Sequence, residues 1–331
     1  MAERQLLDAP GSVADDALDG LCLAHPDLIR RDREHGYVVR AEPGPVKVAL
    51  VSGGGSGHEP LHAGFVGRGM LDAAVPGAVF ASPTAVQIEA ATAAADRGRG
   101  VVHIVKNYTG DVLNFSIAGE LAGEAGITLE TVLVDDDLAT DGLPGPGRRG
   151  TAAVVAVEKI CGAAAERGAS PAEVAALGRR VVAGARSMAL ALTGCTRPGG
   201  SGPSFELGPD EVEFGVGIHG ERGIGRRPFG PAAELVEALT VPVVQALELG
   251  RGDRVIAIVN GLGATPPPQL LVAYRNLAGL LTGRGVTVAR SLVGPYVTAL
   301  DMAGFSVTLV RADDETLSLW DAPVRTPALT W

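Results

Sequence analysis

Lysine is scarce in this sequence of 331 residues, which holds only Lys47, Lys106 and Lys159. None of the three follows a glycine, whereas a phosphate-binding P-loop ends in Gly-Lys-Ser or Gly-Lys-Thr. The Rossmann dinucleotide fingerprint is absent from residues 53–60 as well, because its last glycine is replaced by His58 or by Pro60, depending on where the count starts. A nucleotide held by a P-loop is therefore not expected.

Cysteine is equally rare. Cys22, Cys161 and Cys195 are far apart and form no Cys-x-x-Cys pair, so neither a disulfide framework nor a zinc site is expected. The amino terminus carries no signal-peptide pattern and no apolar run reaches membrane-spanning length. The net charge of -10 argues against nucleic-acid and anionic-membrane partners. We expect a cytoplasmic protein with buried thiols.

What the sequence does contain predicts an α/β protein of two domains. It is 46% hydrophobic and 20% charged, with 46 glycines, and its first half alternates strands with helices. That alternation predicts a Rossmann-like parallel or mixed sheet flanked by helices over residues 1–192. Residues 193–203 are rich in glycine, proline and serine and suggest a boundary. Residues 193–331 then read as an α+β domain with a mixed sheet.

Several local patterns predict single elements. The expected elements are a strand over 48–51 that ends in a glycine loop, a short helix over 61–69, a helix after 84 capped by Ser82, a helix from 171 to about 190, and a strand over 212–218.

Ionisable residues gather at three predicted strand ends: His58 after the glycine loop, Lys106 with Asp111, and His219 between glycines. Histidine with a carboxylate is the usual equipment of general acid–base catalysis. The residues alone leave open whether His219 is a base, a metal ligand or a nucleophile. Parallel strands bind ligands at their carboxyl ends, so these loops are the candidate site.

Other polar residues have simpler interpretations. His25, His35, His62 and His103 are read as packed or surface histidines. The run 135–137 of three aspartates is read as helix-capping or surface rather than as a metal cluster, because consecutive strand residues point to opposite sides. Arg148 and Arg149 are either a phosphate clamp or a cover for a domain edge.

Four motifs, and a fifth near the end, resemble the substrate-binding K subunit of the dihydroxyacetone kinase family. They are Gly-Gly-Gly-Ser-Gly-His-Glu-Pro at 53–60, Lys-Asn-Tyr-Thr-Gly-Asp at 106–111, Gly-Ile-His-Gly-Glu at 217–221, Asn-Gly-Leu-Gly-Ala-Thr-Pro at 260–266 and Thr-Ala-Leu-Asp-Met-Ala-Gly-Phe-Ser at 298–306.

The resemblance implies a mechanism. The histidine matching His219 attacks the ketone of dihydroxyacetone and forms a hemiaminal, which separates ketones and aldehydes from polyols. Asp111 and His58 hold the terminal hydroxyl and assist its deprotonation. Lys106 and the backbone of Gly55, Ser56 and Gly57 surround the remaining oxygens of dihydroxyacetone.

The resemblance also implies partners. Family members that use ATP directly carry a further helical domain, so no cofactor or metal is expected in this chain, and Mg-ADP or Mg-ATP is expected on a separate L subunit. A phosphotransfer M subunit fed from phosphoenolpyruvate and a homodimer are also implied. Residues 142–147 and 195–200 depart from the family pattern, and these differences bear on the partner surface or the substrate range.

Two alternatives remain beside the dihydroxyacetone kinase subunit. One is a kinase subunit for another short ketose or aldose, such as erythrulose or glyceraldehyde. The other is a non-catalytic ketose-binding regulator that kept the pocket. The presence of His58, Asp111 and His219 together favours the enzyme, because a binder has no need of an acid–base pair.

Overall fold

The computed structural model describes residues 4–331, and they pack as two compact units. The Lys106 unit comprises Asp8–Val134, Val154–Arg180 and Ser318–Trp331. The His219 unit comprises residues 4–7, Asp135–Ala153 and Val181–Leu317. The division into domains 1–192 and 193–331 stays a prediction, and each unit is described by itself.

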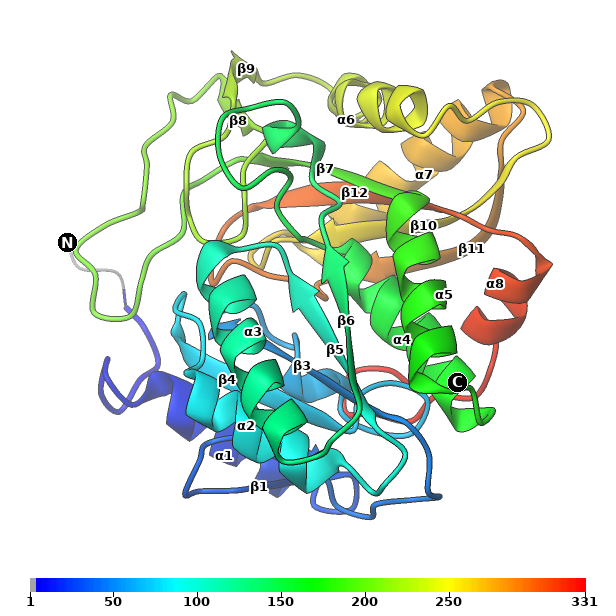
Figure 1. The fold of residues 1–331 in the computed structure, drawn as a ribbon. Coiled ribbons are helices and arrows are strands. Elements are labelled where there is room, and N and C mark those ends of the chain that lie inside the picture. Colours follow the sequence, from blue (N-terminus) through cyan, green and yellow to red (C-terminus); the bar gives the residue numbers. More distant parts are fainter. Residues whose placement is uncertain (1–3) are drawn as a thin grey trace. The chain divides into compact units, whose positions relative to one another are not determined.

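The Lys106 unit is built on a mixed six-stranded sheet in the order β1-β2-β4-β3-β5-β6 (Figure 1). Strands β3 to β6 pair in parallel, and β1 and β2 extend the sheet antiparallel. The strands are β1 (Ile29–Arg31), β2 (Val38–Arg40), β3 (Ala49–Ser56), β4 (Ala73–Val79), β5 (Val101–Lys106) and β6 (Leu129–Val134).

Helices α2 and α3 pack against each other and against β3 to β5 of this sheet (Figure 1). Their apolar side chains form one core with the odd-numbered residues of the strands, for example Val51 and Val105. The helical segments that begin in this part of the chain are α1 (Val13–Ala24), η1 (Ala63–Phe65), α2 (Ala85–Ala95), α3 (Thr109–Glu124), α4 (Ala153–Glu166) and α5 (Pro171–Ala183).

The His219 unit is built on a second mixed six-stranded sheet, in the order β11-β10-β12-β7-β8-β9. Only β10 and β11 pair in parallel, so this sheet has the antiparallel character expected of an α+β domain. The strands are β7 (Ala185–Ala191), β8 (Glu211–Phe214), β9 (Gly225–Pro228), β10 (Arg254–Gly261), β11 (Thr287–Gly294) and β12 (Gly304–Arg311).

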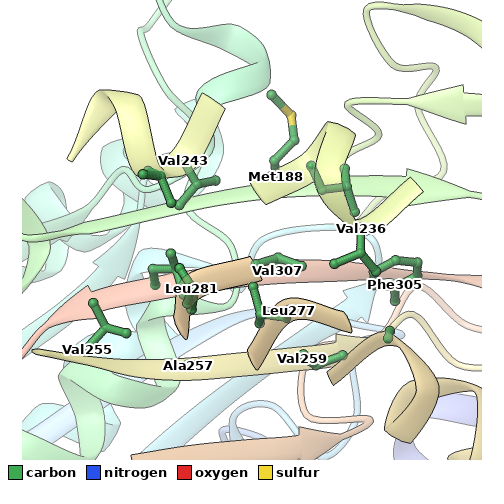
Figure 2. Close-up of a cluster of buried hydrophobic side chains, with 14 of the residues drawn as sticks. Met188, Val236, Val243, Val255, Ala257, Val259, Leu277, Leu281, Phe305 and Val307 are labelled. Carbon is green, nitrogen blue, oxygen red and sulfur yellow. The ribbon is translucent and has the colours of Figure 1, made fainter. Parts of the chain in front are cut away.

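Helices α6 (Ala232–Ala246) and α7 (Pro267–Gly283) cover one face of the second sheet. Figure 2 shows their valines and leucines packed onto β7, β10 and β12, with Val236 and Leu277 among the buried contacts. The 3-10 turn η2 (Leu138–Thr140) also lies in this unit, and α8 (Asp314–Trp320) follows β12. The predicted α/β fold with a second, mixed-sheet half is confirmed.

The glycine run after residue 51 is not a loop, so the prediction of a strand over 48–51 followed by a glycine loop is corrected. Gly53, Gly54 and Gly55 continue β3 and pair in parallel with residues 75–77 of β4. A Cβ on Gly53 would lie 2.5 Å from the carbonyl oxygen of Val75, so only glycine allows this close approach. The turn starts at Gly57, whose φ of 100° is in the region that glycine favours.

Four other predicted elements differ. The helix starting at 171 ends at Ala183, because residues 185–191 pair with β12 as a strand. Thr84, not Ser82, caps α2, through a capping box with Gln87. Residues 61–69 contain only the short η1, and β8 ends at Phe214 rather than at 218. No helix in the described part of the chain is long and apolar enough to cross a membrane.

Candidate functional site

Lys106 and Asp111 meet at the carboxyl end of β5. Lys106 is the last residue of β5, and Asp111 lies in the first turn of α3. The Nζ atom of Lys106 is 3.7 Å from Oδ2 of Asp111 and donates to the carbonyl oxygen of Gly53 at 3.2 Å. Both side chains are buried, at 1% and 3% exposure. The amino end of a helix favours a carboxylate, so the position of Asp111 in the first turn of α3 suits its place beside Lys106.

Gly54 leaves the space that this ion pair occupies. A Cβ on Gly54 would lie 2.5 Å from Nζ of Lys106 and 3.4 Å from Oδ2 of Asp111. The glycine strand β3 thus lies directly against the ion pair. Of the neighbouring residues predicted to bind substrate, Gly55 belongs to the same strand, and the Ser56 hydroxyl donates to the Gly77 carbonyl oxygen at 2.7 Å.

His58 is buried in the turn after β3, with 1% exposure. Its ring stacks on Phe80 with 5.2 Å between centroids. The Gly57 amide donates to Oε1 of Glu59 at 3.0 Å, which closes the turn before the histidine. The stacking holds the imidazole in one orientation, a property required of an acid–base group.

Behind Lys106, the buried hydrogen bonds continue into the protein. Nζ of Lys106 is 2.8 Å from Nε2 of His62, and Nδ1 of His62 is 2.6 Å from Oε1 of Glu158 on α4. The Ser52 hydroxyl lies 3.1 Å from the same Nδ1 and donates to the Ile104 carbonyl oxygen. Lys106 is therefore part of a chain of four polar side chains that runs from Asp111 to Glu158.

Burial shifts the pKa values of three of these side chains, His62, Lys106 and Glu158. Desolvation, and then the nearby Lys106 and His58, hold the pKa of His62 well below its usual value, so its imidazole is neutral. Desolvation also lowers the pKa of Lys106, although the charges of Asp111 and Glu158 oppose that shift. Desolvation raises the pKa of Glu158 to about 8, although the charge of Lys106 opposes that shift.

Sequence reasoning missed two members of this chain. His62 is buried as expected of a packed histidine, but it contacts Lys106 instead of only filling space. His103, by contrast, contacts Thr92 and packs on Phe115, as a core histidine does. The signal for Glu158 was available, because an acidic residue stands among the many alanines and valines of residues 152–165.

His219 belongs to the other unit, where a network of ion pairs holds its loop. The His219 backbone amide donates to Oε2 of Glu221 at 2.8 Å, and Oε1 of Glu221 accepts from Arg149 at 3.0 Å. Arg149 also donates to Asp137 and to the Gly215 carbonyl oxygen. Arg149 thus links Asp137 to the Gly215 and Glu221 ends of the His219 loop. The phosphate-clamp and domain-edge interpretations of Arg148 and Arg149 stay predictions.

The three aspartates at 135–137 are structural. Asp136 is buried and accepts from Thr151, from the Ala153 amide and from the Ser187 hydroxyl. Asp137 caps η2, as the capping interpretation predicts. Arg148, the neighbour of Arg149, pairs with Asp135 and Asp141. Across residues 4–331, no three histidine, cysteine, aspartate or glutamate side chains gather as a metal site.

Gly217 is required by the Glu221 contacts, and this gives a stability prediction. A Cβ at Gly217 would overlap Oε1 of Glu221 and lie 2.7 Å from Arg149. In Gly217→Ala the Glu221 side chain must move and lose its bonds to His219 and Arg149, so we expect a loss of about 1–3 kcal/mol in the free energy of unfolding. Urea titration measures this loss.

The control for Gly217→Ala is Gly225→Ala, because a Cβ on Gly225 meets nothing within 4 Å. That variant should unfold at nearly the same urea concentration as the wild type. Equal stability of the two variants would show that Glu221 does not anchor the loop.

Comparison with known proteins assigns the chain to a family. Residues 19–328 match the model of the Dak1 domain. The chain belongs to the Dak1 domain family. It is 47% identical over 354 residues, 99% of each chain, to the dihydroxyacetone-binding subunit DhaK of the PEP-dependent dihydroxyacetone kinase of Escherichia coli (strain K12). It is 42% identical to the L-erythrulose 1-kinase of Mycolicibacterium smegmatis, over 98% of this chain and 57% of that protein.

Solved structures of Dak1 relatives share the fold. The dihydroxyacetone kinase of C. freundii superposes with a TM-score of 0.89 at 34% identity, over 100% of this chain and 60% of that one. The dihydroxyacetone kinase operon co-activator Dha-DhaQ also reaches a TM-score of 0.89, at 32% identity, over 95% of this chain and 96% of that one.

Proposed function

We propose that this chain is the dihydroxyacetone-binding subunit of a dihydroxyacetone kinase. The observation that supports this most is the buried Lys106–Asp111 pair against the glycine strand, in a chain 47% identical over its whole length to a subunit of that name. In the proposal, the pocket holds a short polar substrate and Asp111 faces the hydroxyl that receives phosphoryl.

The proposed role of His219 is covalent. An imidazole nitrogen bonds to the ketone carbon, the C=O π pair moves to the oxygen, and the imidazole proton is transferred to that oxygen. The product is a hemiaminal, and no oxidant or reductant is needed. The reaction requires a carbonyl, so it selects ketones and aldehydes over glycerol. The Arg149–Glu221 network supports this role, because it restrains the loop that carries the nucleophile.

Phosphoryl transfer then uses Asp111 and His58 as the acid–base pair. Asp111 accepts the proton of the terminal hydroxyl as the oxygen attacks phosphorus, while Lys106 and the backbone of residues 55–57 contact the other substrate oxygens. We propose that the phosphoryl donor is a Mg-nucleotide on a separate L subunit, recharged by an M subunit from phosphoenolpyruvate, and that this chain acts as a homodimer in the cytoplasm.

A test of the subunit assignment is activity with and without the partner. The purified chain given ATP and dihydroxyacetone should form no dihydroxyacetone phosphate, because no lysine of its sequence stands in the Gly-Lys-Ser or Gly-Lys-Thr end of a P-loop. Adding an L subunit with its donor machinery should start turnover. Product from the isolated chain would reveal a nucleotide site here and overturn the assignment.

Two relatives favour specific alternatives. The similarity to an L-erythrulose 1-kinase supports a four-carbon ketose as substrate. The similarity to the co-activator Dha-DhaQ supports a non-catalytic regulator. Comparing kcat/KM for dihydroxyacetone, erythrulose and glyceraldehyde decides the first alternative. Binding of a ketose without turnover in the complete system would support the second.

A further inference from the structure

Glu158 occupies an unusual place for a carboxyl group. It lies on α4 with 0% exposure, its Oε1 contacts His62, and its Oε2 has no hydrogen-bond partner. Burying an ionised carboxylate that has one oxygen without a hydrogen-bond partner costs free energy, and that cost falls when the group takes up a proton. His62 gives the proton a direct route to Glu158, because its Nδ1 is 2.6 Å from Oε1 of Glu158.

His62 connects Glu158 to Lys106 through its two ring nitrogens. Nε2 is 2.8 Å from Nζ of Lys106, and Nδ1 is 2.6 Å from Oε1 of Glu158. A neutral imidazole donates from one nitrogen and accepts at the other, so it can link the two groups in two ways. In the first, the Lys106 ammonium donates to Nε2, and Nδ1–H donates to a Glu158 carboxylate. In the second, protonated Glu158 donates to Nδ1, and Nε2–H donates to a neutral Lys106 amine.

The two arrangements differ by the movement of two protons. The Nζ–H bond of Lys106 breaks and a bond forms at Nε2, while the Nδ1–H bond breaks and an O–H bond forms on Oε1 of Glu158. Each donor atom keeps its electron pair. The charges on Lys106 and Glu158 are neutralised together, the total charge is unchanged, and no other reactant takes part.

We propose that Lys106, His62 and Glu158 form a buried proton relay that removes the positive charge beside Asp111 when Asp111 acts as a base. His62 and Glu158 are positioning residues, because they act through Lys106. This inference rests on the proposed function, since it assigns the relay to the step in which Asp111 takes a proton. A cation 3.7 Å from a carboxylate makes it a weaker base. Neutralising Lys106 therefore makes Asp111 a stronger base.

The surroundings of each group support the relay. Glu158 is faced by His62, by Lys106 on β5, by Ser52 on β3 and by Cys161 on its own helix. Burial brings the proton affinities of the two ends together, since it lowers the pKa of Lys106 and raises that of Glu158 to about 8. It also keeps His62 neutral, which a relay by tautomer exchange requires.

The kinetic test is Glu158→Gln, which keeps the shape and can still accept from Nδ1 of His62, but cannot take the proton. Lys106 then stays an ammonium and Asp111 stays a weaker base. We expect kcat to fall roughly tenfold, a part of the 10²–10⁴-fold that general-base catalysis contributes. Because the relay needs Glu158 as a carboxylate before it takes the proton, the acid limb of the wild-type kcat–pH profile should lie near the pKa of Glu158, about 8, and in Glu158→Gln it should move to lower pH.

The matched control is Glu166→Gln, on the same helix α4, whose carboxylate pairs with Arg40 instead. It should keep both kcat and the position of the acid limb. If Glu158 only fills space, Glu158→Gln lowers thermal stability but leaves the acid limb where it is in the wild type, and the relay is refuted.

A second measurement does not depend on activity or on the folding of the Glu158 variant. The 15N shifts of imidazole-labelled histidine report which nitrogen carries the proton, and His62→Gln assigns the signal. In the wild type we expect His62 to be neutral from pH 6 to 9, with both nitrogens between the shifts of the pure tautomers. In Glu158→Gln they should take the values of the Nδ1–H tautomer. His103→Gln, another buried histidine, should leave the His62 signals unchanged.

The outcomes separate the relay from the proposed function. A single tautomer of His62 in the wild type at every pH, or an imidazolium near pH 6.5, overturns the relay whether or not the chain supports turnover. Absence of ketose turnover in the complete system, with the expected exchange of His62 tautomers, overturns the proposed function and leaves the relay as a property of the pocket.

Discussion

Replacing Asp111 by asparagine should leave dihydroxyacetone binding nearly intact and lower turnover by two or more orders of magnitude. A terminal hydroxyl loses its proton with difficulty at neutral pH, so phosphoryl transfer to it benefits from a positioned base. General-base catalysis typically contributes about 10²–10⁴-fold, or roughly 3–5 kcal/mol of barrier. Asparagine keeps the shape and most of the hydrogen bonding but removes the basic oxygen. Calorimetry of substrate binding beside steady-state rates with the L subunit measures both quantities.

The control for Asp111→Asn must separate base chemistry from the loss of a helix-terminal charge. Asp16 lies in the first turn of α1 in the same unit, as Asp111 does in α3. Asp16→Asn removes a comparable charge and should keep wild-type turnover. His58→Asn should also lose turnover, by a smaller factor, with some loss of binding. If Asp111→Asn and His58→Asn both turned over at the wild-type rate, neither residue would be the base, and the pocket would be a ketose receptor.

The sequence predicted several segments to within a residue but misplaced two strand ends, because β3 continues to Ser56 and β8 stops at Phe214. The apolar run at 100–105 predicts a strand, and the patterns at 85–95 and 268–283 predict helices; they lie within a residue of β5, α2 and α7. The end of the first of them predicts the meeting of Lys106 with Asp111. These segments have clear end signals, such as the capping box of α2 and the proline at the start of α7, and such signals are information that a single sequence carries. The fold class followed from their alternation.

The errors occurred where tertiary contacts override local preference. Glycines normally weaken a strand, yet residues 53–55 remain in β3 because β4 and the Lys106 side chain pack too closely for any Cβ. Residues 185–191 are rich in helix-forming alanine and leucine, but pairing with β12 makes them a strand. Neither constraint is visible without the partner segment.

The polar chain behind Lys106 was missed for a related reason. His62 and Glu158 are 96 residues apart, and each looks ordinary in its own segment. A buried ionisable residue becomes informative only through its partner, because the same histidine can be a packed residue, as His103 is, or a link to a charged group. The apolar surroundings of Glu158 in α4 were the one local sign that this carboxyl needed a buried partner.

His219→Ala should abolish the covalent adduct with dihydroxyacetone and sharply reduce the selection of ketones over glycerol. In the proposed mechanism, the hemiaminal bond is the only interaction that a polyol cannot imitate, since hydrogen bonds from Lys106 and the glycine strand serve any hydroxylated substrate. Removing the nucleophile therefore removes the selectivity, while the folded pocket remains. Native mass spectrometry at low temperature, without chemical reduction, detects the adduct by its added mass. Competition calorimetry measures the affinity for the ketone relative to that for glycerol.

The comparison variant is His25→Ala, because His25 is half-exposed as His219 is, and its backbone amide closes the end of α1 without any need for the imidazole. That variant should form the adduct at the wild-type level. A second variant tests the anchoring of the loop. Glu221→Gln keeps His219 but weakens the charged contact to Arg149. It should slow adduct formation without abolishing it. A crystal soaked with dihydroxyacetone that shows no bond from His219, or an adduct that survives in His219→Ala, would assign the selection of ketones to other residues.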